Sequence, residues 1–305
     1  MKSVKKEFVK NWDLYLFMLI PIVFVLVFNY GPMYGAQIAF RKYTISKGAF
    51  GSPWVGLDNF IRFFNTHGSI DVISNTVGIS LYGLLAGFPI PIFLALALNH
   101  CPFIRFKKIV QMLTYAPYFI STVVMCSLII QFLAPRNGIV NILSALFFNK
   151  ESINFMGRGD WFSSIYVWTG IWQGMGWSSI IYISALSGVS PELHETATID
   201  GASIFQRIIH IDIPGILPII SINLILSAGN ILNVGFEKVY LLQNPLNIRN
   251  SEVIQTLVYK IGLNVAGIPD FSYSSAIGLM VSVANLIILL TVNGILKRMN
   301  QQGLV

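Results

Sequence analysis

Six long apolar segments constrain the fold of this chain more than any other feature of its sequence. Each is close to the roughly 20 residues that a helix needs to cross the hydrocarbon core of a membrane. They cover residues 14–34, 72–98, 109–133, 162–185, 215–234 and 272–296. The composition agrees, because 11% of the 305 residues are charged, whereas about a quarter are charged in a typical soluble domain. The sequence therefore predicts an all-α integral membrane protein with six transmembrane helices.

The six segments contain no Asp, Glu, Lys, Arg or His. A charged group at the bilayer centre costs about 2.5–3.5 kcal/mol, and proton-coupled carriers accept that cost because their mechanism needs such a group. The segments therefore argue against a proton-coupled secondary transporter. Sodium coupling through carbonyl and amide oxygens stays open as an alternative.

The basic residues predict the orientation of the chain. Residues 1–10 resemble the basic start of a signal peptide, but the apolar run that follows is too long and lacks a small-residue cleavage site after Tyr34. It is therefore predicted to be an uncleaved first span with a cytoplasmic N-terminus. Half of the 20 basic residues then fall in short inner segments close to the spans, where the positive-inside rule has force. Both termini and the loop around Glu195 are predicted to be cytoplasmic.

The loop before the fifth segment is the most informative polar stretch. Ser190 is a good N-cap with Pro191 as the first helical residue, and Gly201 is a C-terminal stop. A second short helix is predicted from Ser203 to His210, so that two helices are hinged at a glycine. An acidic excess is unusual for a cytoplasmic loop and suggests contact with a partner; the charged residues are Glu192, Glu195, Asp200, Arg207 and Asp212.

This stretch resembles the cytoplasmic EAA loop of permease subunits in binding-protein-dependent ABC importers. The family pattern is E-A-A, three residues, G, nine residues and I-x-L-P. Thr196 replaces the first Ala and Ile213 replaces Leu, whereas the residues in register are Glu195, Ala197, Gly201, Ile211 and Pro214. The flanking sequence, including FEKV at residues 236–239, is similar to the oligosaccharide branch, the LplB-like permeases. The resemblance extends from about residue 75 to residue 297.

The resemblance implies the type I ABC importer permease fold and a transport subunit without catalytic activity. Residues 1–305 would form one transmembrane permease domain, with an N-terminal helix and outer segment (1–71), a permease core (72–297) and a cytoplasmic coupling loop (186–214). The implied location is the bacterial inner or plasma membrane. The implied partners are a second permease, commonly a different chain, an ATPase dimer and an extracellular or periplasmic solute-binding protein. The residues expected to couple to the ATPase are Glu195, Ala197, Asp200, Gly201, Ile211 and Pro214.

The chain offers little other chemistry. It lacks a Gly-x-x-x-x-Gly-Lys-Ser/Thr phosphate loop, so ATP and Mg are expected on the partner ATPase and no cofactor is expected here. Cys101 and Cys126 lie at different levels and are not expected to pair. Nucleic acid is not expected as a partner despite the net charge of +7. No metal site is expected, because ligand spacing is lacking among the four dispersed histidines, His67, His100, His194 and His210.

Uncharged hydrogen-bonding groups on the fourth and fifth segments are candidates for a substrate path. Amides pair with sugar hydroxyls, and aromatic rings stack on the apolar face of a sugar. The residues predicted to line the path are Trp172, Gln173, Asn223 and Asn230. A structural role is the alternative for each, because amides also join helices and Trp also marks membrane interfaces.

The predicted function is the import of an oligosaccharide or another sugar. Within the importer class, the EAA loop is equally compatible with a permease for a non-sugar solute. An ion-coupled carrier of an uncharged solute differs in needing no ATP. A membrane-embedded sensor without transport would not need a polar path through the spans.

Overall fold

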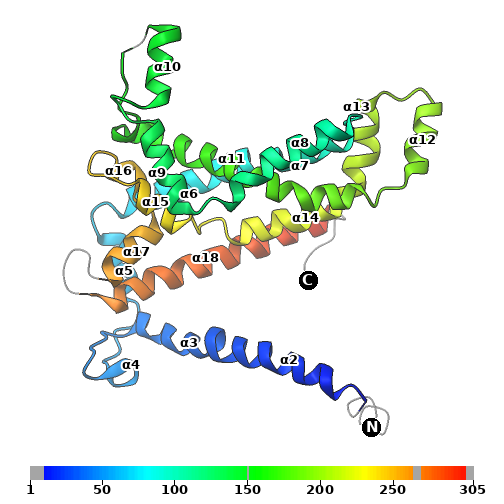
Figure 1. Cartoon of the computed structure of the whole chain (residues 1–305). Helices are drawn as coiled ribbons and strands as arrows, with labels where there is room; N and C mark the ends of the chain where they lie inside the picture. Colours follow the sequence, from blue (N-terminus) through cyan, green and yellow to red (C-terminus); the bar gives the residue numbers. More distant parts are fainter. Residues whose placement is uncertain (1–9, 150, 264–268, 300–305) are drawn as a thin grey trace. The chain divides into compact units, whose positions relative to one another are not determined.

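The computed structural model describes residues 10–149, 151–263 and 269–299. Within these ranges the regular structure is helical, apart from one antiparallel bridge between Arg41 and Trp54. The chain divides into two compact units, whose elements are labelled in Figure 1. One comprises Met1–Thr66 and Val258–Met280, and the other comprises His67–Leu257 and Val281–Val305. Lys2, Lys5 and Lys6, on which the predicted orientation partly rests, lie outside the described residues.

The first unit begins with a long apolar helix that matches the predicted first span. Asp13 lies in its first turn, where an acidic side chain interacts favourably with the helix dipole. Two short helices follow before the unit is completed by residues 258–280. The elements of this part are α2 (Trp12–Val25), a π-helical turn (Leu26–Tyr30), α3 (Gly31–Met33), a 3-10 helix (Tyr34–Phe40), α4 (Gly48–Gly51) and α5 (Asp58–Asn65).

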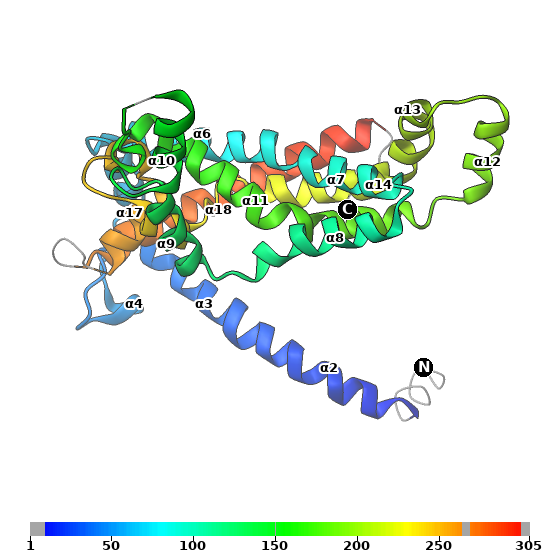
Figure 2. The ribbon, with the colours of Figure 1, turned by 45° about the horizontal axis from the view of Figure 1, so that its top comes forward.

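Long helices form the body of the second unit. Helix α11 packs against α6, α7, α8 and α14, and Figures 1 and 2 both show it running alongside them. Helix α18 begins in the first unit and continues into the second. The bounds are α6 (Ser69–Gly87), α7 (Pro89–Asn99), α8 (Ile104–Tyr115), α9 (Thr122–Phe132), α11 (Gly159–Leu186), α14 (Ile213–Gly229) and α18 (Phe271–Arg298).

Four of the described helices are long and apolar enough to cross a membrane, or five if a bent pair counts as one span. The four are Trp12–Phe40, Ser69–Asn99, Ile204–Gly229 and Phe271–Arg298. The predicted fourth span corresponds to α11, whose 28 residues are long enough at about 1.5 Å per residue. Its Trp, Ser and Gln side chains make it less apolar than the others. The count of six spans therefore stays a prediction.

Residues 109–133, predicted as the third span, do not form one continuous helix. Helices α8 and α9 meet at an angle of 102°, with a 3-10 turn (Ala116–Phe119) between them. Pro117 lacks a backbone N–H and disfavours continuation of the first helix. Ser121 then caps the second helix, because its Oγ accepts a hydrogen bond from the Val124 N–H at 3.4 Å. Two local signals together break the segment.

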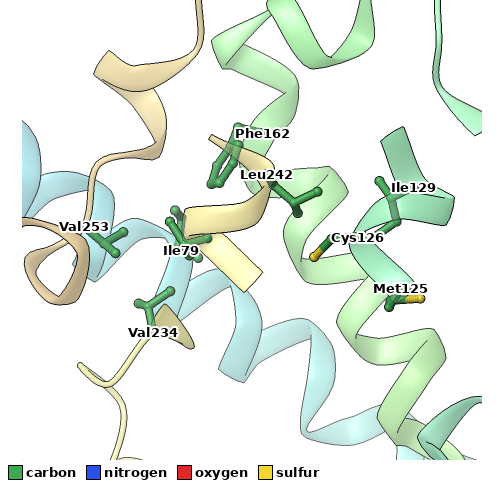
Figure 3. Close-up of a cluster of buried hydrophobic side chains, with 9 residues drawn as sticks. Ile79, Met125, Cys126, Ile129, Phe162, Val234, Leu242 and Val253 are labelled. Carbon is green, nitrogen blue, oxygen red and sulfur yellow. The ribbon is translucent and has the colours of Figure 1, made fainter. Parts of the chain in front are cut away.

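A cluster of buried side chains joins α6, α9, α11 and α15 at one end of the second unit (Figure 3). Ile79, Cys126, Phe162 and Leu242 are almost fully buried in it. The segments predicted as outer connections are thus partly helical, and several of them pack into this core. Their helices are α10 (Ile139–Phe148), α15 (Phe236–Leu242), α16 (Ile248–Ser251) and α17 (Ile254–Gly262).

Candidate functional site

Helix α12 (Pro191–Ile199) projects at the end of the second unit opposite to α10, as Figures 1 and 2 show. Ser190 precedes it in an extended conformation and Pro191 is its first residue, as the sequence predicts. The helix ends at Asp200, and Gly201 follows with a φ of +79°, in the left-handed region that favours glycine. A Cβ at position 201 would meet no atom within 4 Å. Backbone conformation, and not steric crowding, therefore favours glycine at this position.

The second helix of the loop differs from the prediction. Ser203 and Gln206 form a reciprocal capping box at the start of α13 (Ile204–Arg207). The chain then continues through a π-helical turn (Ile208–Asp212) into α14, so that Ile204–Gly229 is a single helix. A proline normally clashes with the carbonyl four residues earlier. The wider π-helical turn just before Pro214 gives the ring room, so Pro214 does not begin a separate helix.

Helices α12 and α13 present a mixed apolar and acidic surface. Glu195 and Asp200 are exposed, whereas Ala197 and Ile211 are half-buried. Arg207 Nη1 donates a hydrogen bond to Thr198 Oγ1 at 2.9 Å and so links α13 to α12. A groove of about 450 Å³ beside this link is lined by His194, Glu195, Thr198, Ile199 and Arg207. Large apolar side chains on the same helices are exposed, namely Leu193, Ile199 and Phe205.

A buried acidic residue connects α12 to two of the long helices. Asp212 is completely buried in the π-helical turn, and its Oδ2 lies 2.6 Å from Nε2 of His100 at the end of α7. Its Oδ1 lies 3.3 Å from Nε2 of His194 on α12, in ion-pair range but without hydrogen-bond geometry. The two imidazole rings meet edge to face at 5.9 Å. A buried carboxylate is costly unless it is paired, so these partners hold α12 against α7 and α14.

Sequence reasoning missed this cluster of His100, His194 and Asp212. The three residues are separated by up to 112 positions, and no local spacing brings them together. The available signal was Asp212 itself, a carboxylate placed within an otherwise apolar stretch, directly before the fifth predicted span. Such a residue needs a partner, and the partners come from other helices.

Two adjoining cavities lie among the long helices of the second unit, with volumes of about 400 and 310 Å³. Both are bounded by α6, α7 and α11, and they share Gly83, Gly87, Pro91 and Ser178. The larger cavity also reaches α14, and its polar lining comes from Ser80, Ser178, Tyr182, Asn223 and Ser227. Hydroxyl, amide and aromatic groups therefore line a partly open space that extends along these helices.

The cavities contain two of the four predicted path residues. Gln173 lines the smaller cavity, and its Nε2 donates to the Ile120 carbonyl at 2.9 Å. Asn223 lines the larger one, and its Nδ2 donates to the Ile219 carbonyl at 3.0 Å. Neither Trp172 nor Asn230 belongs to these linings: Trp172 is exposed on α11, and Asn230 lies at the C-terminal end of α14.

One charged residue lines the smaller cavity and was not among the predicted site residues. Lys238 on α15 is 9% exposed, and its Nζ donates to the Tyr166 carbonyl at 2.8 Å. Burial lowers its pKa from 10.5 to about 8. The sequence predicts that this lysine lies in an outer connection, where charged residues are common and do not indicate a site.

The first unit contains a separate polar pocket of about 410 Å³. Arg62 Nη1 lies 2.6 Å from Asp270 Oδ2, and the guanidinium lies 4.2 Å from the centre of the Tyr273 ring. The backbone N–H of Tyr43 donates to Ser272 Oγ at 2.8 Å. These contacts join residues 41–66 to the segment that starts α18.

Residues 72–301 match the family described as "Binding-protein-dependent transport system inner membrane component". The chain is 40% identical over 303 residues to the polygalacturonan/rhamnogalacturonan transport system permease protein YteP of Bacillus subtilis (strain 168), covering 99% of this chain and 93% of that protein. It is 37% identical over 304 residues to protein LplB of the same organism, covering 100% of this chain and 93% of that one.

Solved structures resemble nearly the whole chain, among them two crystal structures of alginate transporters. One is the crystal structure of a bacterial ABC transporter involved in the import of the acidic polysaccharide alginate, with 35% identity, a TM-score of 0.88 and coverage of 97% of this chain and 99% of that one. The other is that of a bacterial alginate ABC transporter in complex with an alginate pentasaccharide-bound periplasmic protein. Its TM-score is 0.89 at 35% identity, and the match covers 98% of this chain and 99% of that one.

Proposed function

This chain belongs to the family of inner membrane components of binding-protein-dependent transport systems, and on that premise we propose that it is the permease through which an ABC importer moves oligosaccharides. It is a non-catalytic subunit of such an importer. The observation that carries the sugar assignment is the pair of adjoining cavities lined by amide, hydroxyl and aromatic side chains. The names of the relatives, which concern galacturonans and alginate, support the same class of substrate.

The proposed arrangement in the membrane has six spans, with α11 as the fourth and the bent α8–α9 pair as the third. Both termini and Glu195 lie on the cytoplasmic side. Residues 72–297 form the permease core and 186–214 the coupling loop of one permease domain that includes the N-terminal residues 1–71. The outer segments, among them the pocket beside Arg62, receive a substrate-loaded binding protein.

Coupling to ATP hydrolysis is assigned to α12 and α13. The apolar side chains of Leu193, Ile199 and Phe205, together with Glu195, offer a docking surface for an ATPase dimer that binds ATP and Mg. The small side chain of Ala197 allows the ATPase to approach α12 closely, and Gly201 sets the angle between α12 and α13. The EAA motif is completed by Asp200, Ile211 and Pro214. Movement of α12 reaches α7 and α14 through His194, Asp212 and His100.

Substrate passage is assigned to the paired cavities. Gln173 and Asn223 are in position to exchange hydrogen bonds with sugar hydroxyls. Trp172 and Asn230 are proposed to contact the sugar in another conformation of the spans. Alternating access requires more than one such conformation. A second permease, commonly a different chain in this family, supplies the opposite wall.

The test is uptake by the complete importer in proteoliposomes. The chain is purified with its second permease, the ATPase and the binding protein, and labelled oligosaccharides are offered with and without internal ATP. ATP-dependent uptake of a sugar that the binding protein delivers is the expected result. Uptake driven by an ion gradient without ATP, or ATP-dependent uptake restricted to a non-sugar solute, would contradict the proposal.

A further inference from the structure

Lys238 is a buried ammonium in the wall of the smaller cavity. That cavity is also lined by Gln173, Gly170 and Tyr166. The Nζ atom donates one hydrogen bond to the Tyr166 carbonyl at 2.8 Å and lies 4.9 Å from the centre of the Tyr166 ring. An ammonium has three donors, so this carbonyl alone does not satisfy it.

No carboxylate compensates the charge of this lysine within the part of the chain that the structure describes. The ion pairs found there involve Arg62, His100, Arg158, His194 and Arg249 instead. A buried cation without an anionic partner is unfavourable. The lowered pKa of Lys238, about 8, has the same origin in burial. Near neutral pH the group is nevertheless mostly protonated, and an anion that entered the cavity would relieve its isolation.

The space beside the ammonium is open because glycines face it. A Cβ at Gly170 would lie 3.2 Å from the Lys238 Nζ, which is tight enough to crowd the group. Gly83, Gly87, Gly170 and Gly174 all line the same cavity. The helices therefore leave room for a ligand beside the charge.

A purely structural role for Lys238 explains less. Helix α15 is already anchored by Val239 and Leu242, which are 0% and 1% exposed in the buried cluster. The Gly235 N–H also donates to the Tyr166 hydroxyl at 3.0 Å. An apolar side chain at position 238 would pack in the same place without the cost of burying a charge.

We propose that Lys238 is a specificity-determining residue that pairs with the carboxylate of an acidic sugar during passage, so that the importer selects uronate-containing oligosaccharides over neutral ones. This inference rests on the proposed function, because it assigns a substrate class to the same cavities. Amides and hydroxyls recognise the neutral part of the sugar, and the lysine recognises its charge.

The test compares one oligosaccharide in two forms. The complete importer in proteoliposomes is offered a short oligogalacturonate and the fully methyl-esterified compound, which has the same backbone without charge. Lys238→Met removes the ammonium, Lys238→Arg keeps a positive charge, and Lys108→Met on the exposed part of α8 is the matched control. The initial rate, the KM for uptake and the thermal stability of each complex are measured.

The parent is expected to prefer the acidic compound. Lys238→Met should raise the KM for uptake of the acidic compound at least about tenfold, and the thermal stability of the complex should not change. If the ester is transported, this variant should no longer prefer the acidic compound over it. Lys238→Arg should retain the preference for the acidic compound, at least in part, and Lys108→Met should match the parent.

A parent that prefers the ester, or a Lys238→Met complex that keeps the parent's KM and preference, overturns the inference while leaving the proposed function intact. Equal losses for both compounds together with lower thermal stability would assign Lys238 a structural role instead. A parent that imports neither compound nor any other sugar would contradict the proposed function itself.

Discussion

At the scale of single residues, the buried carboxylate of Asp212 explains how a short polar loop can be connected to the long helices. It contacts one histidine on α7 and one on α12, so that three elements share one charge. The arrangement depends on complete burial, since the same contacts in water would be worth little.

His194→Ala removes the contact between α12 and Asp212 and is expected to uncouple the importer. Stimulation of ATP hydrolysis by the loaded binding protein should fall at least about fivefold, although the complex still assembles. His210→Ala is the matched control, because that exposed histidine bonds, among the residues that the structure describes, within its own helix, to the Gln206 carbonyl at 2.9 Å. Equal stimulation in both variants would refute the role given to the cluster.

Gly201 offers a second residue-scale prediction. Its positive φ costs a residue with a Cβ roughly 1 kcal/mol or more, and no steric contact adds to that cost. Gly201→Val should therefore lose the stimulation of ATP hydrolysis, whereas Gly201→Asn should keep most of it, because Asn tolerates the left-handed region. Stimulation assays on the purified complexes decide the matter. A Val variant that behaves like the Asn variant would show that the hinge conformation is dispensable.

The pKa of Lys238 predicts a pH dependence. Its value of about 8 lies below the ordinary 10.5. Between about pH 8 and pH 10.5 the folded chain therefore binds fewer protons than the unfolded chain. In this pH range the lysine makes the stability of the fold rise with pH. Uptake of an acidic oligosaccharide should instead decline above about pH 8, as the ammonium is lost. The titratable groups around it are the Tyr166 phenol, the Cys126 thiol and the neighbouring Glu237 carboxylate. Lys238→Arg should flatten the profile, since Arg stays protonated; an unchanged decline would point to another group.

At the scale of elements, the π-helical turn between α13 and α14 determines where Asp212 points. It accommodates Pro214 and leaves the helix Ile204–Gly229 unbroken. One helix therefore runs from the loop beside α12 into the body of the second unit. The α8–α9 bend is the opposite case, in which Pro117 and the Ser121 cap divide one apolar segment in two.

Pro214→Ala tests the turn. With a backbone N–H restored at position 214, the regular α-helical bonding pattern becomes available, and contraction of the turn would rotate Asp212 away from His100. Stimulation of ATP hydrolysis should fall several-fold. Pro218→Ala lies one turn further along the same helix and should have little effect. Equal behaviour of the two proline variants would show that the turn does not depend on Pro214.

At the scale of the whole molecule, the family and the helical architecture agree with a permease that is organised for transmission between two ends. In the second unit, α12 and α13 lie at one end, whereas α10 and α15 lie at the other (Figure 1). The two adjoining cavities lie on the helices that join these ends. The proposed substrate path and the proposed coupling loop are therefore joined by α7, α11 and α14.

Cysteine labelling tests the predicted orientation. In a background without Cys101 and Cys126, an impermeant reagent should label a cysteine at position 148 on α10 in intact cells. A cysteine at position 195 on α12 should react only after permeabilisation. Labelling of position 195 from outside would reverse the proposed topology.

The sequence by itself determined the class of fold, the approximate bounds of most long helices and the start and stop of α12. These features are local: the length of an apolar run, a proline at the first turn and a glycine where φ must be positive. The bend in 109–133 has local signals, Pro117 and the Ser121 cap, which the length of the apolar run conceals. The tertiary structure alone decided that the helix starting at Ile204 continues past Pro214, and that Gln173 and Asn223 line cavities whereas Trp172 and Asn230 do not. It also decided that Asp212 meets His100 and His194 and that Lys238 is buried, because these contacts join residues far apart in the chain. Burial of a polar group becomes costly only when other helices close around it, and sequence spacing does not record which helices those are.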